Sequence, residues 1–437
     1  MSEKNKGFNP NSMNFGGKGW LFCLFAAIAF FVPTCLGSAW QMAVQYWEAA
    51  YGWDRTFILT MSTIGGLLTV VTAFLVSALA LKKSPRKISI VLVIIYIALL
   101  FIVGASKSLP LTCLCIILIA AVGSNWCYNV NPIIIANWFP RKKGLVMGLV
   151  TMGIPLAAGL TTRIIAAAHE RFGMSLMFIP YIIMAAVALL FLLFFVKDNP
   201  EEANFNPDND RSMTTEQAQE MNRIALEADK NSPWTRSRVL KTKEVWIIAL
   251  AMGVQLLYAG GVMSQMILAF MGRGYEMSRA ANLMLTTALF AVLGSWLMGY
   301  VDNFLGPRRA IQLTYLIGAA GCALLIWAPG SLLYVGLFLI GSTVGGAANF
   351  SASLCASYWG RYNFKRAYGV IQPIIQIVGA FAPAFMAQLA KFPGGYNVSY
   401  IGLIVMMILG LIVFSTVKDG SFVQRREAEF AEEDNKQ

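Results

Sequence analysis

The chain has 437 residues, of which 57% are apolar and only 13% are charged, far from the balance of a soluble globular protein. Several apolar runs reach the roughly 20 residues needed to cross a bilayer, and the period-2 alternation of a barrel is missing, so we expect an all-α integral membrane protein. The net charge of +12 is concentrated in alternate loops, which indicates membrane orientation and excludes a nucleic-acid-binding patch.

Twelve apolar spans are expected, in two pseudo-symmetric bundles of six helices. The polar segment 1–19 lacks a signal-peptide pattern and is interpreted as a cytoplasmic tail. The first bundle covers 20–196, a cytoplasmic linker covers 197–243, the second bundle covers 244–417, and a cytoplasmic tail covers 418–437. The expected spans are 20–44, 55–81, 88–106, 110–137, 145–168, 174–196, 244–270, 279–301, 310–328, 331–358, 367–390 and 397–417.

The basic residues alternate from loop to loop, which favours both termini in the cytoplasm. The loops expected on the other side of the membrane hold single cations such as Lys107. Short loops and tails suggest a bacterial inner membrane. The basic loops contain Lys82, Lys83, Arg86 and Lys87, then Arg141, Lys142 and Lys143, then Arg308 and Arg309, and finally Arg361, Lys365 and Arg366.

The linker is the only long polar insert. Within it, the run from Thr214 to Gln217 predicts a capping box that opens a short charged helix through about Asp229. A solvated helix joining the two bundles is the simplest interpretation.

The two halves repeat each other. Arg86 and Arg308 are 222 positions apart, and Trp138 and Trp359 are 221 apart. A parallel repeat about an axis along the membrane normal predicts a substrate site near the midplane, between the halves.

Arg163 is the one charge placed deep within an apolar span. Burying a guanidinium there is costly unless it has a partner or meets water, so such residues usually line a pathway. A planar guanidinium suits a carboxylate, and we therefore predict a small organic anion as cargo. Snorkelling of the long side chain to the outer interface is the alternative.

Uncharged polar side chains in the spans form further candidates. Asn125 and Asn129 lie four residues apart beside Tyr128, and Gln372 and Gln376 repeat that spacing near Pro373, so each pair shares a helix face. Each pair either orients a substrate in a mostly apolar pocket or forms interhelical hydrogen bonds. The remaining candidates are Ser38, Gln41, Gln255, Tyr258 and Asn349.

The chain resembles the major facilitator superfamily in its twelve spans, central linker and repeated basic loops. The loop Gly299–Arg309 is similar to that family's hallmark motif and carries Asp302, Asn303, Gly306 and Arg308, although the family's acid falls on Asn303. In the first half, Lys82 stands where the acid belongs, followed by Arg86 and Lys87. The resemblance implies a gating role for these loops and a cavity lined by spans one, four, five, seven, ten and eleven.

Three segments narrow the resemblance to the oxalate:formate antiporter and monocarboxylate transporter branch. They are "NWFPRKKGLVMG", "KDNPEEANFNPD" and "SPWTRSRVLKTKEVWII". Those relatives place a basic residue in span eight or eleven, and neither span has one here, so their substrate is not inherited.

These features predict a secondary active transporter that works by alternating access, and not an enzyme. No phosphate-cradling motif is present, and neither a cofactor nor a metal site is indicated. No Asp or Glu lies mid-span, which favours exchange or gradient-driven uptake without proton coupling through a carboxylate. We expect a monomer. Two alternatives stay open: a transporter of larger amphipathic or lipophilic compounds, and a transporter-like sensor or receptor.

Overall fold

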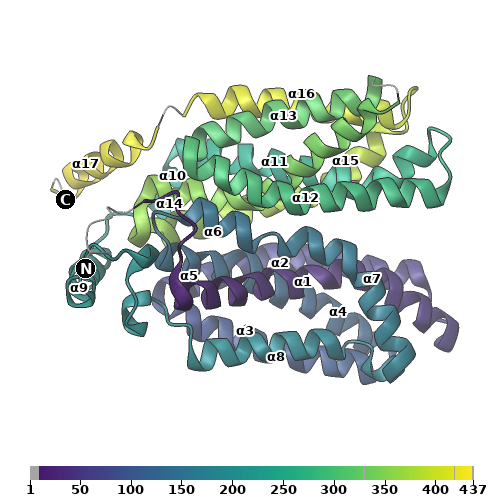
Figure 1. Cartoon of the computed structure of the whole chain (residues 1–437), viewed down its shortest axis with the longest axis horizontal. Helices are drawn as coiled ribbons and strands as arrows, with labels where there is room; N and C mark the ends of the chain where they lie inside the picture. Colours follow the sequence, from purple (N-terminus) through teal and green to yellow (C-terminus); the bar gives the residue numbers. More distant parts are fainter. Residues whose placement is uncertain (1–8, 328–329, 418, 436–437) are drawn as a thin grey trace, which may run out of the picture.

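The computed structural model describes residues 9–327, 330–417 and 419–435, and regular structure within these ranges is helical throughout. The helices form two bundles that lie side by side with their long axes aligned (Figure 1). The polar helices α9 (Thr215–Lys230) and α17 (Ser421–Asn435) lie at the same end of the molecule, called the linker side below (Figure 1).

The first bundle contains six apolar crossings. Its fourth crossing is divided into α4, η1 and α5, and its fifth into α6 and α7. The elements are α1 (Gly16–Tyr51), α2 (Arg55–Lys82), α3 (Pro85–Ala105), α4 (Leu109–Ser124), η1 (Asn125–Val130), α5 (Asn131–Trp138), α6 (Lys143–Val150), α7 (Gly153–Phe172), η2 (Met174–Leu176) and α8 (Ile179–Phe194).

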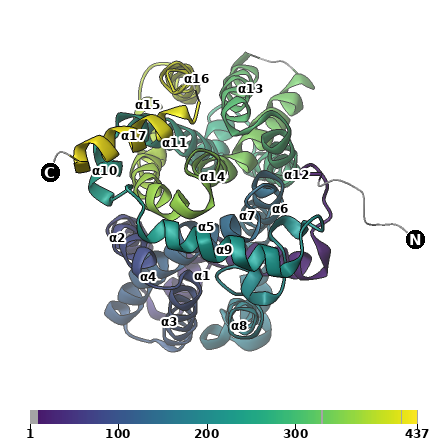
Figure 2. The same ribbon diagram turned by 90° about the vertical axis from the view of Figure 1, so that its left-hand side faces the viewer.

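The linker and the second bundle follow in chain order. Figure 2 shows the linker helix α9 lying across the linker side, between the two bundles. The elements are η3 (Pro200–Ala203), η4 (Pro207–Asn209), α9 (Thr215–Lys230), α10 (Arg236–Lys241), α11 (Lys243–Met271), α12 (Met277–Leu305), α13 (Pro307–Trp327), α14 (Leu332–Ala380), α15 (Ala382–Leu389), α16 (Tyr396–Ser415) and α17 (Ser421–Asn435).

Eleven helical segments of the described chain are long and apolar enough to span a bilayer. One of them, 332–389, is far longer than a single crossing needs. Within α14, Gly360 has φ 68° and ψ −179°, which is not helical. The chain reverses there, because Ser351 before the turn contacts Gln372 after it. This segment therefore holds two of the twelve expected spans, and the predicted fold class is confirmed.

Two interruptions in the first bundle were not predicted. The fourth crossing changes to a π-helix over Asn125–Val130, and the fifth breaks at Thr151 and Met152, between α6 and α7. A π-helical turn inserts one extra residue per turn and often occurs at functional sites. Here it shifts the direction of every side chain that follows Asn125.

The capping box in the linker is confirmed. The backbone N–H of Thr214 donates to Gln217 Oε1 at 3.0 Å, and the N–H of Gln217 donates to Thr214 Oγ1 at 3.3 Å. These reciprocal bonds satisfy N–H groups that have no partner inside the helix, and α9 begins at Thr215.

The sequence repeat reappears as a pair of equivalent contacts. The Arg86 guanidinium donates to the carbonyls of Leu192 and Leu193, both at 2.7 Å. The Arg308 guanidinium donates to the carbonyls of Val417 at 2.9 Å and Ser415 at 3.4 Å. Each arginine thus joins the start of a bundle's third crossing to the end of its sixth.

Glycines on the linker side let the two bundles approach each other closely. A Cβ added to Gly148 of α6 would lie 2.6 Å from Gly299 Cα of α12, and one added to Gly369 of α14 would lie 3.0 Å from Ser77 Cβ of α2. Only a residue without a side chain permits backbones this close. These contacts close the linker side between the two bundles.

Candidate functional site

A cavity of about 300 Å³ lies between the bundles, in the middle of the apolar helices. Its walls come from α1, α2, α4, η1 and α5 of the first bundle and from α11 and α14 of the second. It is lined by Phe30, Gly66, Thr69, Val70, Ser124, Tyr128, Pro132, Met252, Leu256, Gly260, Ala347, Ala348, Ser351, Tyr368, Gln372, Ile375, Gln376, Gly379 and Ala380.

The polar groups of this central cavity are all hydroxyls and amides. Among the described residues that line it, none is charged. Ser351 Oγ donates to Gln372 Oε1 at 3.4 Å, and Gln376 Oε1 is buried without a described hydrogen-bond partner. A buried acceptor without a partner is costly, and because Gln376 lines the cavity, a turn of its amide would present this acceptor to a donor on a bound molecule.

A second hollow of about 240 Å³ adjoins the central cavity within the first bundle. Ser124 and Tyr128 line both spaces. Its other walls include Thr34 and Trp40 of α1 and Ser62 of α2. Trp40 and Ser62 lie toward the ends of α1 and α2 opposite the linker side. The two spaces therefore extend from the middle of the molecule away from the closed end.

Polar contacts between the bundles lie near the cavity. Tyr368 Oη of α14 donates to the backbone carbonyl of Tyr128 at 2.9 Å. At the break between α6 and α7, Thr151 Oγ1 lies 2.7 Å from Ser295 Oγ of α12 and also contacts Asn349 of α14. Asn349 Nδ2 donates to the Ser295 carbonyl at 3.1 Å. Asn349 therefore links the bundles and does not line the central cavity.

Three residues predicted for the site come together in the central cavity: Tyr128, Gln372 and Gln376. The cavity is also lined by four residues that were not predicted for the site: Thr69, Ser124, Ser351 and Tyr368. Tyr368 was detectable, because it lies four residues before Gln372 and continues the face formed with Gln376. Thr69 and the serines carry no comparable signal, since such residues are common in packed membrane helices.

Other predicted residues form hydrogen bonds inside one bundle. Asn125 Nδ2 donates to Thr72 Oγ1 of α2 at 2.8 Å, and Asn129 Nδ2 donates to Asn125 Oδ1 at 3.2 Å. Tyr258 Oη lies 2.8 Å from Thr343 Oγ1. The contacts of Asn125 and Tyr258 join neighbouring helices and correspond to the interhelical alternative, whereas the contact of Asn129 lies within η1. Neither asparagine nor Tyr258 lines the central cavity.

Gln255, unlike these residues, is buried without any hydrogen bond among the described residues. It is only 1% exposed, and neither its amide nitrogen nor its amide oxygen has a hydrogen-bond partner among the described residues. It does not line the central cavity.

Arg163 and Gln41 also lie outside the set of described residues that lines the central cavity. Arg163 is exposed and shares one face of α7 with Leu156 and Leu160, which are 37% and 41% exposed. That face differs from the one that packs on α1, where Thr161 Oγ1 contacts the carbonyl of Cys35. Gln41 is exposed, and the side chain of Ser38 lies outside the described residues.

The loop-motif residues lie on the linker side. Asn303 Nδ2 donates to Asn11 Oδ1 at 2.7 Å, and Gly306 ends α12 with φ 81°. Asp302 is 1% exposed, and a Cβ added to Gly144 of α6 would lie 2.8 Å from its Oδ2. Lys82 and Lys87 are exposed. Asp302 and Asn303 thus bring the second bundle against the first bundle and the N-terminal segment.

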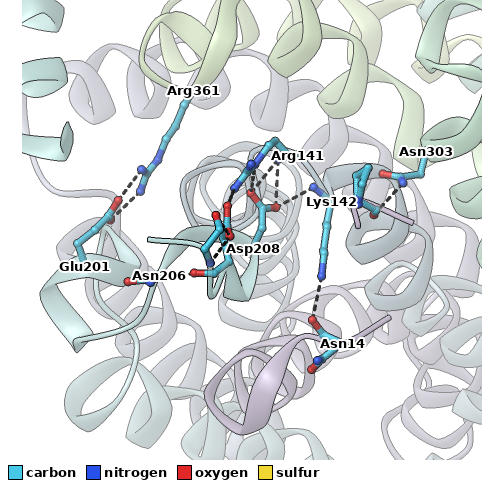
Figure 3. Close-up of polar contacts among 11 residues, drawn as sticks. Asn14, Arg141, Lys142, Glu201, Asn206, Asp208, Asn303 and Arg361 are labelled. Carbon is cyan, nitrogen blue, oxygen red and sulfur yellow. Dashed lines mark hydrogen bonds and ion pairs between the residues drawn. The ribbon is translucent and has the colours of Figure 1, made fainter. Parts of the chain in front are cut away.

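The linker also holds both bundles on this side (Figure 3). Arg361 pairs with Glu201 at 2.7 Å, with side chains only 9% and 3% exposed. Asp208 accepts hydrogen bonds from the N–H groups of Arg141 and Lys142, and Arg141 Nε lies 3.3 Å from its Oδ2. Burial raises the pKa of Asp208, an effect that these donors oppose.

Lys142 connects the same region to the N-terminal segment. Its Nζ donates to the Asn14 carbonyl at 2.9 Å (Figure 3). Burial lowers the pKa of Lys142, and the charge of Asp208 acts in the opposite direction.

Comparisons with known proteins identify the family. The profile of the Major Facilitator Superfamily matches residues 21–383. The inner membrane transport protein RhmT of Escherichia coli K12 is 27% identical over 196 residues. That match spans 42% of this chain and 44% of RhmT, so the chain matches less than half the length of this curated relative.

Solved transporter structures share the fold. The human organic anion transporter MFSD10 superposes with a TM-score of 0.65 at 16% identity, over 90% of this chain and 97% of that one. The proton:xylose symporter XylE gives 0.70 at 14% identity, over 91% and 94%, and FucP in its outward conformation gives 0.66 at 14%, over 93% and 99%. The chain belongs to the Major Facilitator Superfamily and is a membrane transporter, not an enzyme.

Proposed function

We propose that this transporter moves a small organic solute by alternating access and that the solute binds in the central cavity through hydroxyl and amide groups. The observation that carries the proposal is a cavity between the two bundles whose described lining is polar but uncharged. A site at the interface of two repeated halves becomes accessible from one side and then the other when the halves rock against each other.

The size and lining favour a compact solute. A volume of about 300 Å³ is at the lower end for small-molecule pockets, which argues against bulky amphipathic cargo. Phe30, Met252 and Leu256 supply apolar walls, while Gln376 and Tyr128 supply hydrogen bonds. Transferring a full charge into such a site without a charged partner is unfavourable, so an uncharged polar solute fits best.

A small organic anion, such as a carboxylate, is the second candidate. It is supported by Arg163, which has no carboxylate partner among the described residues and is exposed. In this case the anion meets Arg163 on its route or in another conformation. The resemblance to the oxalate:formate and monocarboxylate branch belongs to this candidate as well.

The location and mode of action complete the proposal. We propose an inner-membrane protein that works as a monomer with both termini in the cytoplasm, so that the linker side is cytoplasmic. The structure then represents a state closed toward the cytoplasm. A carboxylate is absent from the described lining of the central cavity, which supports exchange or gradient-driven uptake without a proton-carrying acid in the site.

Counterflow in proteoliposomes tests the function directly. Vesicles preloaded with an unlabelled solute are expected to accumulate the labelled form against its gradient, and a receptor that only binds would not do so. Panels of polyols, neutral amides, carboxylates and bulky amphiphiles are compared, with the double variant Tyr128→Ala/Gln376→Ala as the matched control. Counterflow that this variant retains in full would place the transport site outside the central cavity.

A further inference from the structure

A separate cavity of about 240 Å³ lies on the linker side, between the bundles. One wall belongs to the first bundle and contains Lys82 and Lys83, at the end of α2, and Asn137 of α5. The opposite wall belongs to α14 and contains Arg361 and Lys365. Because both bundles contribute walls, the cavity exists only while the linker side is closed.

Positive charge predominates in this linker-side cavity. Its lining contains four cations and one carboxylate, Asp198. Arg361 pairs with Glu201, and Lys365 Nζ lies 2.7 Å from Asp229 Oδ2. Asp198 Oδ1 accepts the backbone N–H of Arg86 at 2.8 Å. These acids offset part of the positive charge, but they leave Lys82 and Lys83 uncompensated.

The two lysines form no ion pair with a carboxylate anywhere in the described chain, and both are exposed. Lysines in the basic loop at a membrane boundary attract anionic headgroups. Here the boundary is set by the end of α2 at Lys82 and the start of α3 at Pro85.

Arg361 supplies a second, independent feature. Its terminal nitrogens bind Glu201 at 2.7 and 2.9 Å, while its Nε is buried and has no hydrogen-bond partner among the described residues. A buried donor without a partner calls for an acceptor. The Nε has almost no accessible surface in this state, and a turn of the Arg361 side chain toward the cavity that it lines would bring it to an oxygen of a bound anion.

We infer that this linker-side cavity binds a phosphate-bearing anion, held by Lys82, Lys83 and the Nε of Arg361. Phosphate offers several acceptor oxygens and suits both lysine and arginine donors. The apolar residues Leu81 and Leu226 at the same cavity would accommodate the acyl-glycerol part of a phospholipid. Since the walls come from both bundles, the bound anion stabilises the form closed on this side, whatever the cargo is.

The test uses the full chain in phosphatidylcholine nanodiscs and measures Tm. In one arm, inorganic phosphate is titrated against potassium chloride of equal ionic strength. In the other, phosphatidylglycerol replaces increasing fractions of the phosphatidylcholine. Ligand that binds only the folded form raises Tm, and we expect a rise of about 2 °C at a tenfold excess over Kd.

The variant Lys82→Gln/Lys83→Gln is expected to need about 30-fold more anion for the same rise, from the contribution of two lysines near a surface. The matched control, Lys241→Gln/Arg309→Gln, removes two exposed cations of the linker side outside the cavity and should respond like the wild type. A rise in the phosphate arm identifies free phosphate as a ligand, and a rise only with phosphatidylglycerol identifies the lipid headgroup. No rise in either arm, or an equal loss in both variants, would overturn the inference.

Discussion

The hydroxyl of Tyr368 donates to the backbone carbonyl of Tyr128 at 2.9 Å, and this bond joins the two bundles at the wall of the central cavity. Both aromatic residues therefore belong to the site and to the interface that must rearrange during transport. This hydrogen bond therefore links the wall of the central cavity to the relative position of the two bundles.

The variant Tyr368→Phe should slow transport several-fold. It removes the donor of a partly buried hydrogen bond between the bundles, which contributes about 0.5–1.5 kcal/mol, and this loss falls on the form closed on the linker side. The measurement is counterflow in proteoliposomes. Tyr400→Phe is the control, because the Tyr400 hydroxyl is buried without a partner among the described residues. Equal rates in the two variants would separate the Tyr368 bond from the transport cycle.

Gln376→Leu should weaken solute binding by about tenfold while leaving the fold intact. The leucine has nearly the same volume but loses one hydrogen bond to the solute, worth about 1.4 kcal/mol at that ratio. Affinity is measured by titration calorimetry on the solute identified by counterflow. Gln388→Leu, at an exposed position of α15, serves as the control. Unchanged affinity in Gln376→Leu would remove this amide from the site.

Arg163 separates the two cargo candidates. For an uncharged solute we expect Arg163→Ala to keep binding within about threefold, because Arg163 does not line the central cavity. An organic anion paired with the guanidinium requires instead that Arg163→Ala abolish transport and Arg163→Lys restore part of it. Transport of each solute class by the wild type and both variants decides between them.

Gly148→Ala should prevent tight closure of the linker side and reduce transport at least tenfold. Its new Cβ would lie 2.6 Å from Gly299 Cα, so the backbones must separate. Gly159→Ala, on the next helix of the same crossing, meets only Leu285 at 3.8 Å and should be tolerated. Counterflow rates and Tm are compared. A Gly148→Ala protein with normal transport would show that this glycine contact is not needed.

Gln255→Leu should leave Tm unchanged or raise it. The Gln255 amide is buried with both polar atoms unpaired, and removing such a group relieves a cost of about 1–3 kcal/mol. Thermal unfolding in nanodiscs measures the change, with Gln41→Leu at an exposed position for comparison. A clear fall in Tm would mean that Gln255 holds a group that stabilises the folded chain, such as an ordered water.

The all-helical membrane fold could be predicted from hydropathy because lipid forces every backbone polar group to be paired within a helix. The internal repeat could also be predicted from the sequence. Arg86 and Arg308, which occupy equivalent positions in the two halves, make equivalent contacts at the ends of α8 and α16. Short-range chemistry was predictable too, as the reciprocal bonds of Thr214 and Gln217 show.

The site was only partly predictable, because hydropathy gives the depth of a residue but not the direction of its side chain. Gln372 and Gln376 face the cavity, whereas Asn125 and Asn129, with the same spacing, bond within the first bundle. The π-helix that begins at Asn125 changes which side of the fourth crossing Asn125 and Asn129 face, and no pattern of residues in the sequence predicts it. Arg163 shows the same limit, since its depth did not reveal that it shares a face with exposed leucines.

The clamps formed by Arg86 and Arg308 have a consequence for how the molecule moves. Each guanidinium fastens the start of its bundle's third crossing to the end of the sixth through backbone carbonyls, and carbonyls cannot be lost by changing a side chain. Bending is therefore resisted inside each six-helix unit and is confined to the glycine contacts between them. Covalent cross-links placed within one unit should leave turnover intact, whereas a single link across the glycine contacts should arrest it.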